Sequence, residues 1–154
     1  MAAVLLITGC SLFEDEAQKK VKYFLKDPKS AEFRNTKKAK TPNSPTNLSF
    51  CGEVNSKNAY GAFPGFERYI VDGRLVMLER NGEAFYDQMD GESDAERVVR
   101  NSGILAAKMR FNLYKTKADL ANLLAKEARK KAGMETDTSE AITPFDVMWK
   151  DYCE

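Results

Sequence analysis

The residues of this chain that could carry out chemistry are carboxylates, lysines, tyrosines and three cysteines, because histidine is absent from its 154 positions. That absence removes the commonest general base and the commonest zinc ligand. Two carboxylates can still cleave a glycosidic bond. Glu53 and Glu67 fall in neighbouring predicted strands, and Glu83 lies beyond them. Acidic residues on strands are usually only solvated, so we predict no catalytic residue, metal ligand or cofactor.

The first cysteine, Cys10, ends the stretch Ile7-Thr8-Gly9-Cys10, which follows a short apolar run. This stretch resembles the lipobox of bacterial lipoproteins, in which the chain is cut before the cysteine and the thiol is diacylated. The resemblance implies a signal segment over residues 1–9, lipidation of Cys10 and, from Ser11, an outer-membrane anchor. No Lys or Arg precedes the run, unlike an ordinary signal peptide. The alternative is that residues 2–9 form a buried strand and Cys10 is an ordinary thiol.

If Cys10 is lipidated, two cysteines remain, Cys51 and Cys153. An even number suits an oxidising compartment, and we expect these two to form a disulfide. It would close a loop of about 100 residues, a size at which the chain-entropy model gives a large stabilisation. The alternative is two buried thiols that never meet.

The bulk composition is that of one ordinary soluble domain, with 43% hydrophobic and 31% charged residues. The net charge of +1 gives no overall field that would attract nucleic acid. Residues 34–42 are polar and basic, but no aromatic residues alternate with the lysines to stack on bases. A solvated edge strand protected by lysines is therefore favoured over a phosphate-binding patch.

A helix should follow Cys10, since Ser11 and Glu14 have the spacing of a capping box, and it should end at Asp27-Pro28. A short turn of helix is expected over residues 30–33, and a strand over residues 47–55.

Residues 66–87 predict a three-stranded antiparallel meander. Asp72-Gly73 and Asn81-Gly82 separate its strands, and both pairs suit the positive φ angles of tight hairpin turns. In the middle strand Leu75 and Met77 alternate with Val76 and Leu78, so both of its faces should be covered.

The last third should be helical. Ser93 and Glu96 form a capping box before an apolar stripe over residues 98–113. Thr116 is expected to begin a second segment that ends at Gly133, and Thr143-Pro144 to begin a final helix. The stripe is either core or an interface, since both bury an apolar face.

These elements predict an α+β fold: an N-terminal helix, an antiparallel sheet of about four strands and two or three C-terminal helices. Residues 10–154 would form a single domain, with a helical subregion from residue 92.

Three blocks of sequence, LKDPKSAEFRN (25–35), CGEVNSKNAYG (51–61) and GFERYIV (65–71), carry a second resemblance. They resemble a family of small, uncharacterised bacterial and prophage envelope proteins with D-P-x-S-A-x-F-R and C-G-x-V-N-x-K-N-x-x-G motifs. Many members look like lipoproteins. The resemblance implies a bacterial origin and an extracytoplasmic location, and it implies no catalytic role.

The middle block lies between two predicted strands and offers two interpretations. Asn residues bond their own backbone in turns, so the segment could be a well-capped structural loop. Aromatic and Asn side chains on a rigid loop also make a contact surface. The candidate binding residues are Asn55, Lys57, Asn58, Tyr60, Phe63, Phe66 and Arg68.

The sequence therefore favours a non-catalytic interaction module. It would be held in the cell envelope by lipid on Cys10, on the periplasmic face of the outer membrane, and would bind an envelope or phage protein, as exclusion and immunity proteins do. The alternatives are an accessory subunit of an envelope or virion assembly, and a carboxylate-dependent cell-wall enzyme.

Overall fold

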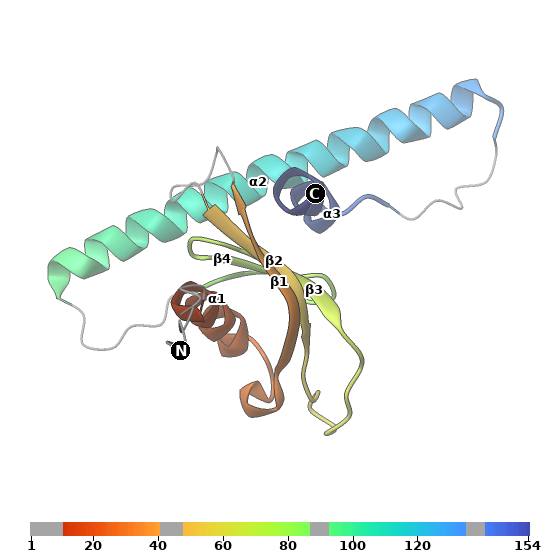
Figure 1. The fold of residues 1–154 in the computed structure, drawn as a ribbon. Helices are drawn as coiled ribbons and strands as arrows, with labels where there is room; N and C mark the ends of the chain where they lie inside the picture. The colour runs from red at the N-terminus through yellow and green to blue at the C-terminus, as the bar shows by residue number, and fades with distance from the viewer. Residues whose placement is uncertain (1–10, 41–47, 87–92, 135–140) are drawn as a thin grey trace, which may run out of the picture.

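A computed structural model of the chain describes residues 11–40, 48–86, 93–134 and 141–154 (Figure 1). Cys10 and residues 1–9, for which lipidation and a signal segment are predicted, lie outside these ranges. The elements in chain order are α1 (Ser11–Tyr23), the 3-10 turn η1 (Pro28–Ser30), β1 (Glu32–Lys40), β2 (Leu48–Asn55), β3 (Glu67–Asp72), β4 (Leu75–Leu78), β5 (Gly82–Phe85), α2 (Asp94–Lys131) and α3 (Pro144–Cys153).

The five strands form one antiparallel sheet in the order β1-β2-β3-β4-β5. The predicted α+β class is confirmed. The strand beyond the expected four is β1, which occupies the sheet edge as the basic segment predicted. A bulge interrupts its pairing between Arg34 and Lys37, where Asn35 has a φ of 54°. Asn tolerates this left-handed conformation better than most residues do.

The meander forms as the turn residues predicted. Gly73 and Gly82 have φ angles of 59° and 76°, which residues with a Cβ rarely adopt. In β4 the four side chains alternate between the two faces of the sheet, and all four are buried. Helices cover both faces of β4, in agreement with its unbroken apolar sequence.

The domain has three layers, with α1 on one face of the sheet and α2 and α3 on the other (Figure 1). On the α1 face, Ala17 and Val21 pack against Val54, Tyr69 and Val76. The α1 helix ends at Tyr23, four residues before the expected stop, and the following turn of helix covers residues 28–30 instead of 30–33. Pro residues favour the first position of a helix, which explains the earlier start.

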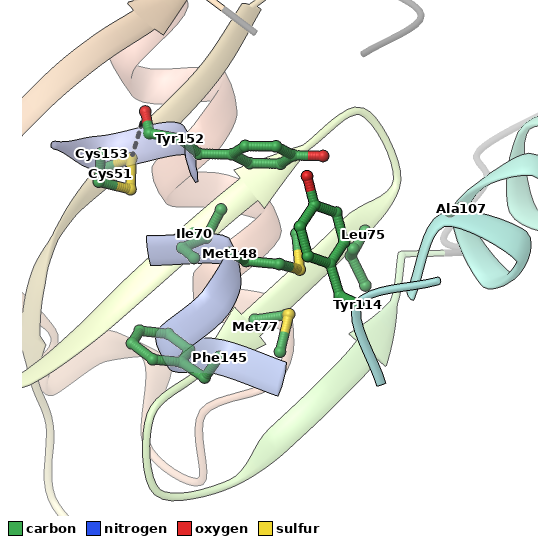
Figure 2. Close-up of a cluster of buried hydrophobic side chains, with 10 residues drawn as sticks. All are labelled: Cys51, Ile70, Leu75, Met77, Ala107, Tyr114, Phe145, Met148, Tyr152 and Cys153. Atoms are coloured by element: carbon green, nitrogen blue, oxygen red, sulfur yellow. Dashed lines mark hydrogen bonds between the residues drawn. A yellow bond between two sulfur atoms is a disulfide. The ribbon is translucent and has the colours of Figure 1, made fainter. Parts of the chain in front are cut away.

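On the other face, α3 supplies most of the buried helix side chains that pack against the sheet (Figure 2). Phe145, Met148 and Tyr152 lie in this core, and the hydroxyl of Tyr152 points toward that of Tyr114 from α2. Cys153 is joined to Cys51 of β2 by a disulfide, with the two Cα atoms 5.9 Å apart. The last turn of the last helix is therefore fixed to β2, an interior strand of the sheet.

The α2 helix is continuous over 38 residues, so the predicted break at Thr116 is wrong. The Thr116 hydroxyl donates to the carbonyl oxygen of Asn112 over 2.9 Å, which accommodates this residue inside the helix. Gly103 does not interrupt the helix either. A Cβ there would lie 3.4 Å from Cδ of Arg74, an ordinary van der Waals distance. The capping box of Ser93 and Glu96 is present.

The buried face of α2 is made of small residues and one tyrosine: Ala107, Tyr114 and Ala118. Most of the large apolar side chains of the helix lie outside this contact and are exposed, whereas Phe111 packs partly against the core. We call the exposed ones the outer stripe, and they are Val98, Val99, Leu105, Met109, Leu113, Leu120, Leu123 and Leu124. The sequence left open whether such a stripe is core or interface, and in the described chain it is not core.

Candidate functional site

Residues 56–66 connect β2 to β3 and hold most of the predicted binding residues, so we call them the signature loop. Asn58 builds its turn. The Asn58 side-chain Oδ1 accepts hydrogen bonds from the backbone N–H groups of Tyr60 (2.9 Å) and Ala62 (3.1 Å). Gly61 closes the turn with a φ of 79°, and its N–H donates to the Asn58 carbonyl oxygen. Asn58 therefore shapes the loop from within.

One side of the loop is tied to η1. The backbone N–H of Lys57 donates to Oγ of Ser30 over 2.9 Å, and the Ser30 hydroxyl donates to the carbonyl oxygen of Asp27. Asp27, Pro28 and Ser30 belong to the D-P-x-S segment, and Lys57 belongs to the C-G-x-V-N-x-K-N segment. The two sequence motifs thus contact each other in the fold.

The other side of the loop is held by Arg80, which sequence reasoning missed. Its guanidinium donates to the carbonyl oxygens of Pro64 (3.3 Å), Gly65 (3.0 Å) and Phe66 (2.8 Å). Arg80 lies just before the Asn81-Gly82 turn, and nothing in its local sequence indicates a contact with a loop about fifteen residues earlier. A charged donor that binds three carbonyls fixes the loop on the sheet.

The tip of the fixed loop presents aromatic side chains to solvent. Tyr60 is 94% exposed and Phe63 is 47% exposed. The Lys57 ammonium lies 5.7 Å from the centre of the Phe63 ring, within the range of a cation–π contact. Rigid, exposed aromatic residues are typical of protein contact surfaces, because they lose little conformational entropy when a partner covers them.

A pocket of about 230 Å³ lies beside the loop, between the segment after α1 and the start of β3. Its volume is below the about 300–1,000 Å³ of sites that enclose a small-molecule ligand. It suits a single protruding side chain better than a cofactor. Its lining includes Phe24, Leu25, Lys57, Asn58, Glu67 and Arg80.

Glu67 is the buried carboxylate of this pocket, with an exposed fraction of 9%. Burial raises the pKa of Glu67 above its usual value, although the hydrogen bond that Oε2 accepts from the Arg80 backbone N–H acts in the opposite direction. The carboxylate helps to hold the strand end beside the Arg80 anchor.

Two predicted binding residues lie at the ends of the loop. Oδ1 of Asn55 is buried and accepts no hydrogen bond from the described residues. Phe66 is half-buried, and the Arg34 guanidinium stacks 3.7 Å from its ring centre. The tip residues Tyr60 and Phe63 are thus more accessible than Asn55 and Phe66.

Arg68, the last predicted binding residue, connects the sheet to α3. Its guanidinium pairs with Glu79 (2.6 Å) and Asp146 (3.5 Å). It also lies 4.9 Å from the ring centre of Trp149 and 5.2 Å from that of Phe145. These contacts give Arg68 a clear structural role, and the prediction that it binds a partner is not needed to explain its position.

The carboxylates that suggested glycoside cleavage do not face one another. Glu53 pairs with Arg68 across β2 and β3, whereas Glu67 pairs with Val54, the next residue along β2. Neighbouring residues of a strand point to opposite faces, so Glu53 and Glu67 cannot flank one bond. Hydrogen bonds from Arg34 and Asn35 lower the pKa of Glu53, and Glu83 lies on β5 at the far edge of the sheet.

Gly52, the second residue of the C-G motif, has a packing role. It pairs with Tyr69 on β3, and a Cβ at position 52 would lie 2.7 Å from the Tyr69 hydroxyl oxygen. That hydroxyl forms a hydrogen bond of 2.9 Å with Oγ1 of Thr36 on β1. The glycine leaves room for the Tyr69 side chain to lie over β2, so that Tyr69 connects β1, β2 and β3.

The part of the chain that the structure describes contains neither a metal-binding cluster nor a membrane-spanning helix. Those residues contain no cluster of three or more Cys, Asp or Glu side chains that could hold a metal ion. None of the described helices, including the long α2, combines the length and the hydropathy required to cross a bilayer.

Comparison with protein-family models, curated proteins and solved structures found no match to this chain.

Proposed function

We propose that this protein is a lipid-anchored bacterial envelope protein that acts as a non-catalytic binding module. Its contact surface is the tip of the signature loop, and its partner is an envelope or phage protein. The observation that carries the proposal is the pairing of rigidity with exposure: Arg80, Ser30 and Asn58 fix the loop, while Tyr60 remains 94% exposed. An aromatic residue held in solvent by a fixed backbone is best explained by a partner that covers it.

The neighbouring pocket supports contact with a protein. A partner that covers Tyr60 and Phe63 would lie beside a cavity of about 230 Å³ with both apolar and charged lining. One protruding side chain of the partner would fill it, and Lys57, at the edge of both features, would meet a carboxylate. We therefore expect a partner segment with an acidic residue beside an apolar one.

The binding site is tested by site-specific photocrosslinking in living bacteria that express the full chain. A photoreactive amino acid in place of Tyr60 should give one discrete adduct with another protein, and the same group in place of exposed Glu83 on β5 should give none. The adduct should recur when the photoreactive group replaces Phe63, the second exposed aromatic residue of the loop. Equal adduct patterns at positions 60 and 83 would contradict the proposal.

The anchor is tested separately by the intact mass of protein from the membrane fraction. We expect a mass that lacks residues 1–9 and carries acyl chains on Cys10, and we expect Cys10→Ser to abolish both changes. A full-length, unacylated chain in the soluble fraction would remove the anchor and the envelope location. It would not change the interpretation of the photocrosslinking at positions 60 and 63.

A further inference from the structure

The outer stripe of α2 is an apolar surface that the described parts of its own chain leave uncovered. Its eight side chains have exposed fractions between 54% for Leu120 and 72% for Val99. A helix turns by about 100° per residue, so Met109 projects nearly opposite to Ala107 of the buried face. Both ends of α2 extend beyond the sheet in Figure 1, and a partner can therefore lie along the full stripe.

The outer stripe runs along most of α2. From Val98 to Leu124 it spans about 40 Å at about 1.5 Å per residue. The largest apolar patch on a typical monomer covers about 300–600 Å² and is often functional. A helix that covers this length also buries flanking side chains, which brings the contact toward the about 800 Å² per partner of a stable complex.

Six of the eight residues of the outer stripe are placed symmetrically about position 111 in the sequence, and Leu105 and Leu120 are the exceptions. Val98 and Leu124 are equally distant from that position in sequence, as are Val99 and Leu123, and Met109 and Leu113. A two-fold axis requires that residue i contacts residue j while j contacts i. Two copies of α2 that cross antiparallel at the level of Phe111, whose own side chain packs toward the core, meet this condition, with apolar residues opposite apolar residues at the centre and at both ends.

The charges of α2 favour the same direction. Acidic Asp94 and Glu96 lie in its first turn, and Lys126, Lys130 and Lys131 lie near its end. Parallel helices would place the two lysine-rich ends side by side. Antiparallel helices separate these ends and bring each one near the acidic start of the other copy, which is the lower-energy arrangement.

We propose that a second copy of this chain covers the outer stripe, with two α2 helices paired antiparallel about a two-fold axis near Phe111. A basic amphipathic helix can also lie on an anionic membrane. The fold favours the second copy, because α1 and α2 cover opposite faces of the sheet and a lipid on Cys10 would precede α1 directly. The stripe would then face away from the side of the sheet that α1 covers.

The dimer is tested by sedimentation of the full chain with Cys10→Ser, which removes any lipid. We expect a dimer whose dissociation constant rises at least about tenfold in Leu113→Glu, because the change places a charge near the axis twice. Lys115→Gln also changes the charge by one unit and lies on α2 away from the stripe, and it should leave the constant unchanged. Below the concentration of dimer formation, thermal unfolding of Leu113→Glu that matches that of the parent would show that the fold itself is intact.

The direction of pairing is tested by cysteine crosslinking in the same background. A mixture of the Val98→Cys and Leu124→Cys variants should form a disulfide-linked pair on mild oxidation. Val98→Cys alone should not, because its two added thiols would lie at opposite ends of the dimer. Crosslinking of Val98→Cys alone would overturn the antiparallel arrangement.

Salt distinguishes a second copy from a membrane. The outer stripe is apolar, so added NaCl should change the dissociation constant of the dimer little. Salt should weaken binding to phosphatidylglycerol vesicles.

A chain that is monomeric at its highest soluble concentration would overturn the proposal. So would a dimer unaffected by Leu113→Glu, or a monomer whose vesicle binding requires Leu113.

Discussion

The two helices that share one face of the sheet use their apolar residues in opposite ways. The ten-residue α3 buries Phe145, Met148 and Tyr152 and ends in a disulfide to β2. The 38-residue α2 buries only two alanines and a tyrosine, and it leaves its leucines in solvent. The two helices show that an apolar stripe predicts a face that is buried against something. It does not predict whether that face packs against the same chain or against another molecule.

The largest expected effect concerns the covalent attachment of α3. Replacing Cys51 and Cys153 by serine opens a loop whose ends are 102 residues apart. The free energy of unfolding should fall by about 4–5 kcal/mol in the chain-entropy model, and urea denaturation of the Cys10→Ser protein with and without the bridge measures it. A variant as stable as its parent would show that α3 is held by packing alone.

The core of α3 should be the next most sensitive part. Met148 has no exposed surface, so Met148→Ala leaves a cavity and should cost about 2–5 kcal/mol. Met109→Ala makes the same chemical change on the outer stripe, where 66% of the residue is exposed. Its effect on monomer stability should be below about 0.5 kcal/mol. Equal losses in the two variants would break the contrast between the helices.

Acid should loosen α3 through the Arg68 contacts. The hydrogen bond from Arg68 lowers the pKa of Glu79, so ionised Glu79 stabilises the fold above its usual pKa of 4.5. That stabilisation is lost as the pH falls below 4.5 toward the lowered value. Glu79→Gln should be slightly less stable at pH 7, by less than about 1 kcal/mol because the pair is partly exposed. It should lose less stability on acidification than the parent does.

The fluorescence of Trp149, the single tryptophan, reports this change directly because Arg68 lies against its ring. Glu96→Gln is the matched control. The pKa of Glu96 is also lowered, but by hydrogen bonds from Ser93 in the cap of α2. Acid titration of Glu96→Gln should therefore retain the fluorescence change of the parent, and loss of that change would assign it to α2.

The smallest effect is expected on the outer stripe of the monomer. The double substitution Leu105→Gln and Leu120→Gln should change the free energy of unfolding by less than about 0.5 kcal/mol per site, measured below the concentration of dimer formation. Ala118→Leu on the buried face is the opposite change, and overpacking should cost about 1–3 kcal/mol. A large loss from the double substitution would mean that the stripe packs within its own chain.

Much of the fold could be predicted because its signals are local. The Asn-Gly and Asp-Gly turns place strand ends through the φ angles that glycine allows, the capping box of α2 fixes its first turn, and Pro144 marks the start of α3. The anchoring of the signature loop was harder to predict. Asn58 acts on its neighbours and could be interpreted from the sequence, whereas Arg80 and Ser30 reach the loop only after the sheet has formed.

By itself, the sequence determined the class of the fold, the order of its elements and the amphipathic character of α2. The tertiary structure alone decided which face of α2 is buried. The periodicity of the sequence predicts that α2 has an apolar face, but it does not predict which face packs against the rest of the domain. Here Ala107 and Ala118 allow close contact with the domain where leucines would not fit. The same close contact leaves the leucines and valines of α2 on the outside, where the described parts of the chain do not cover them.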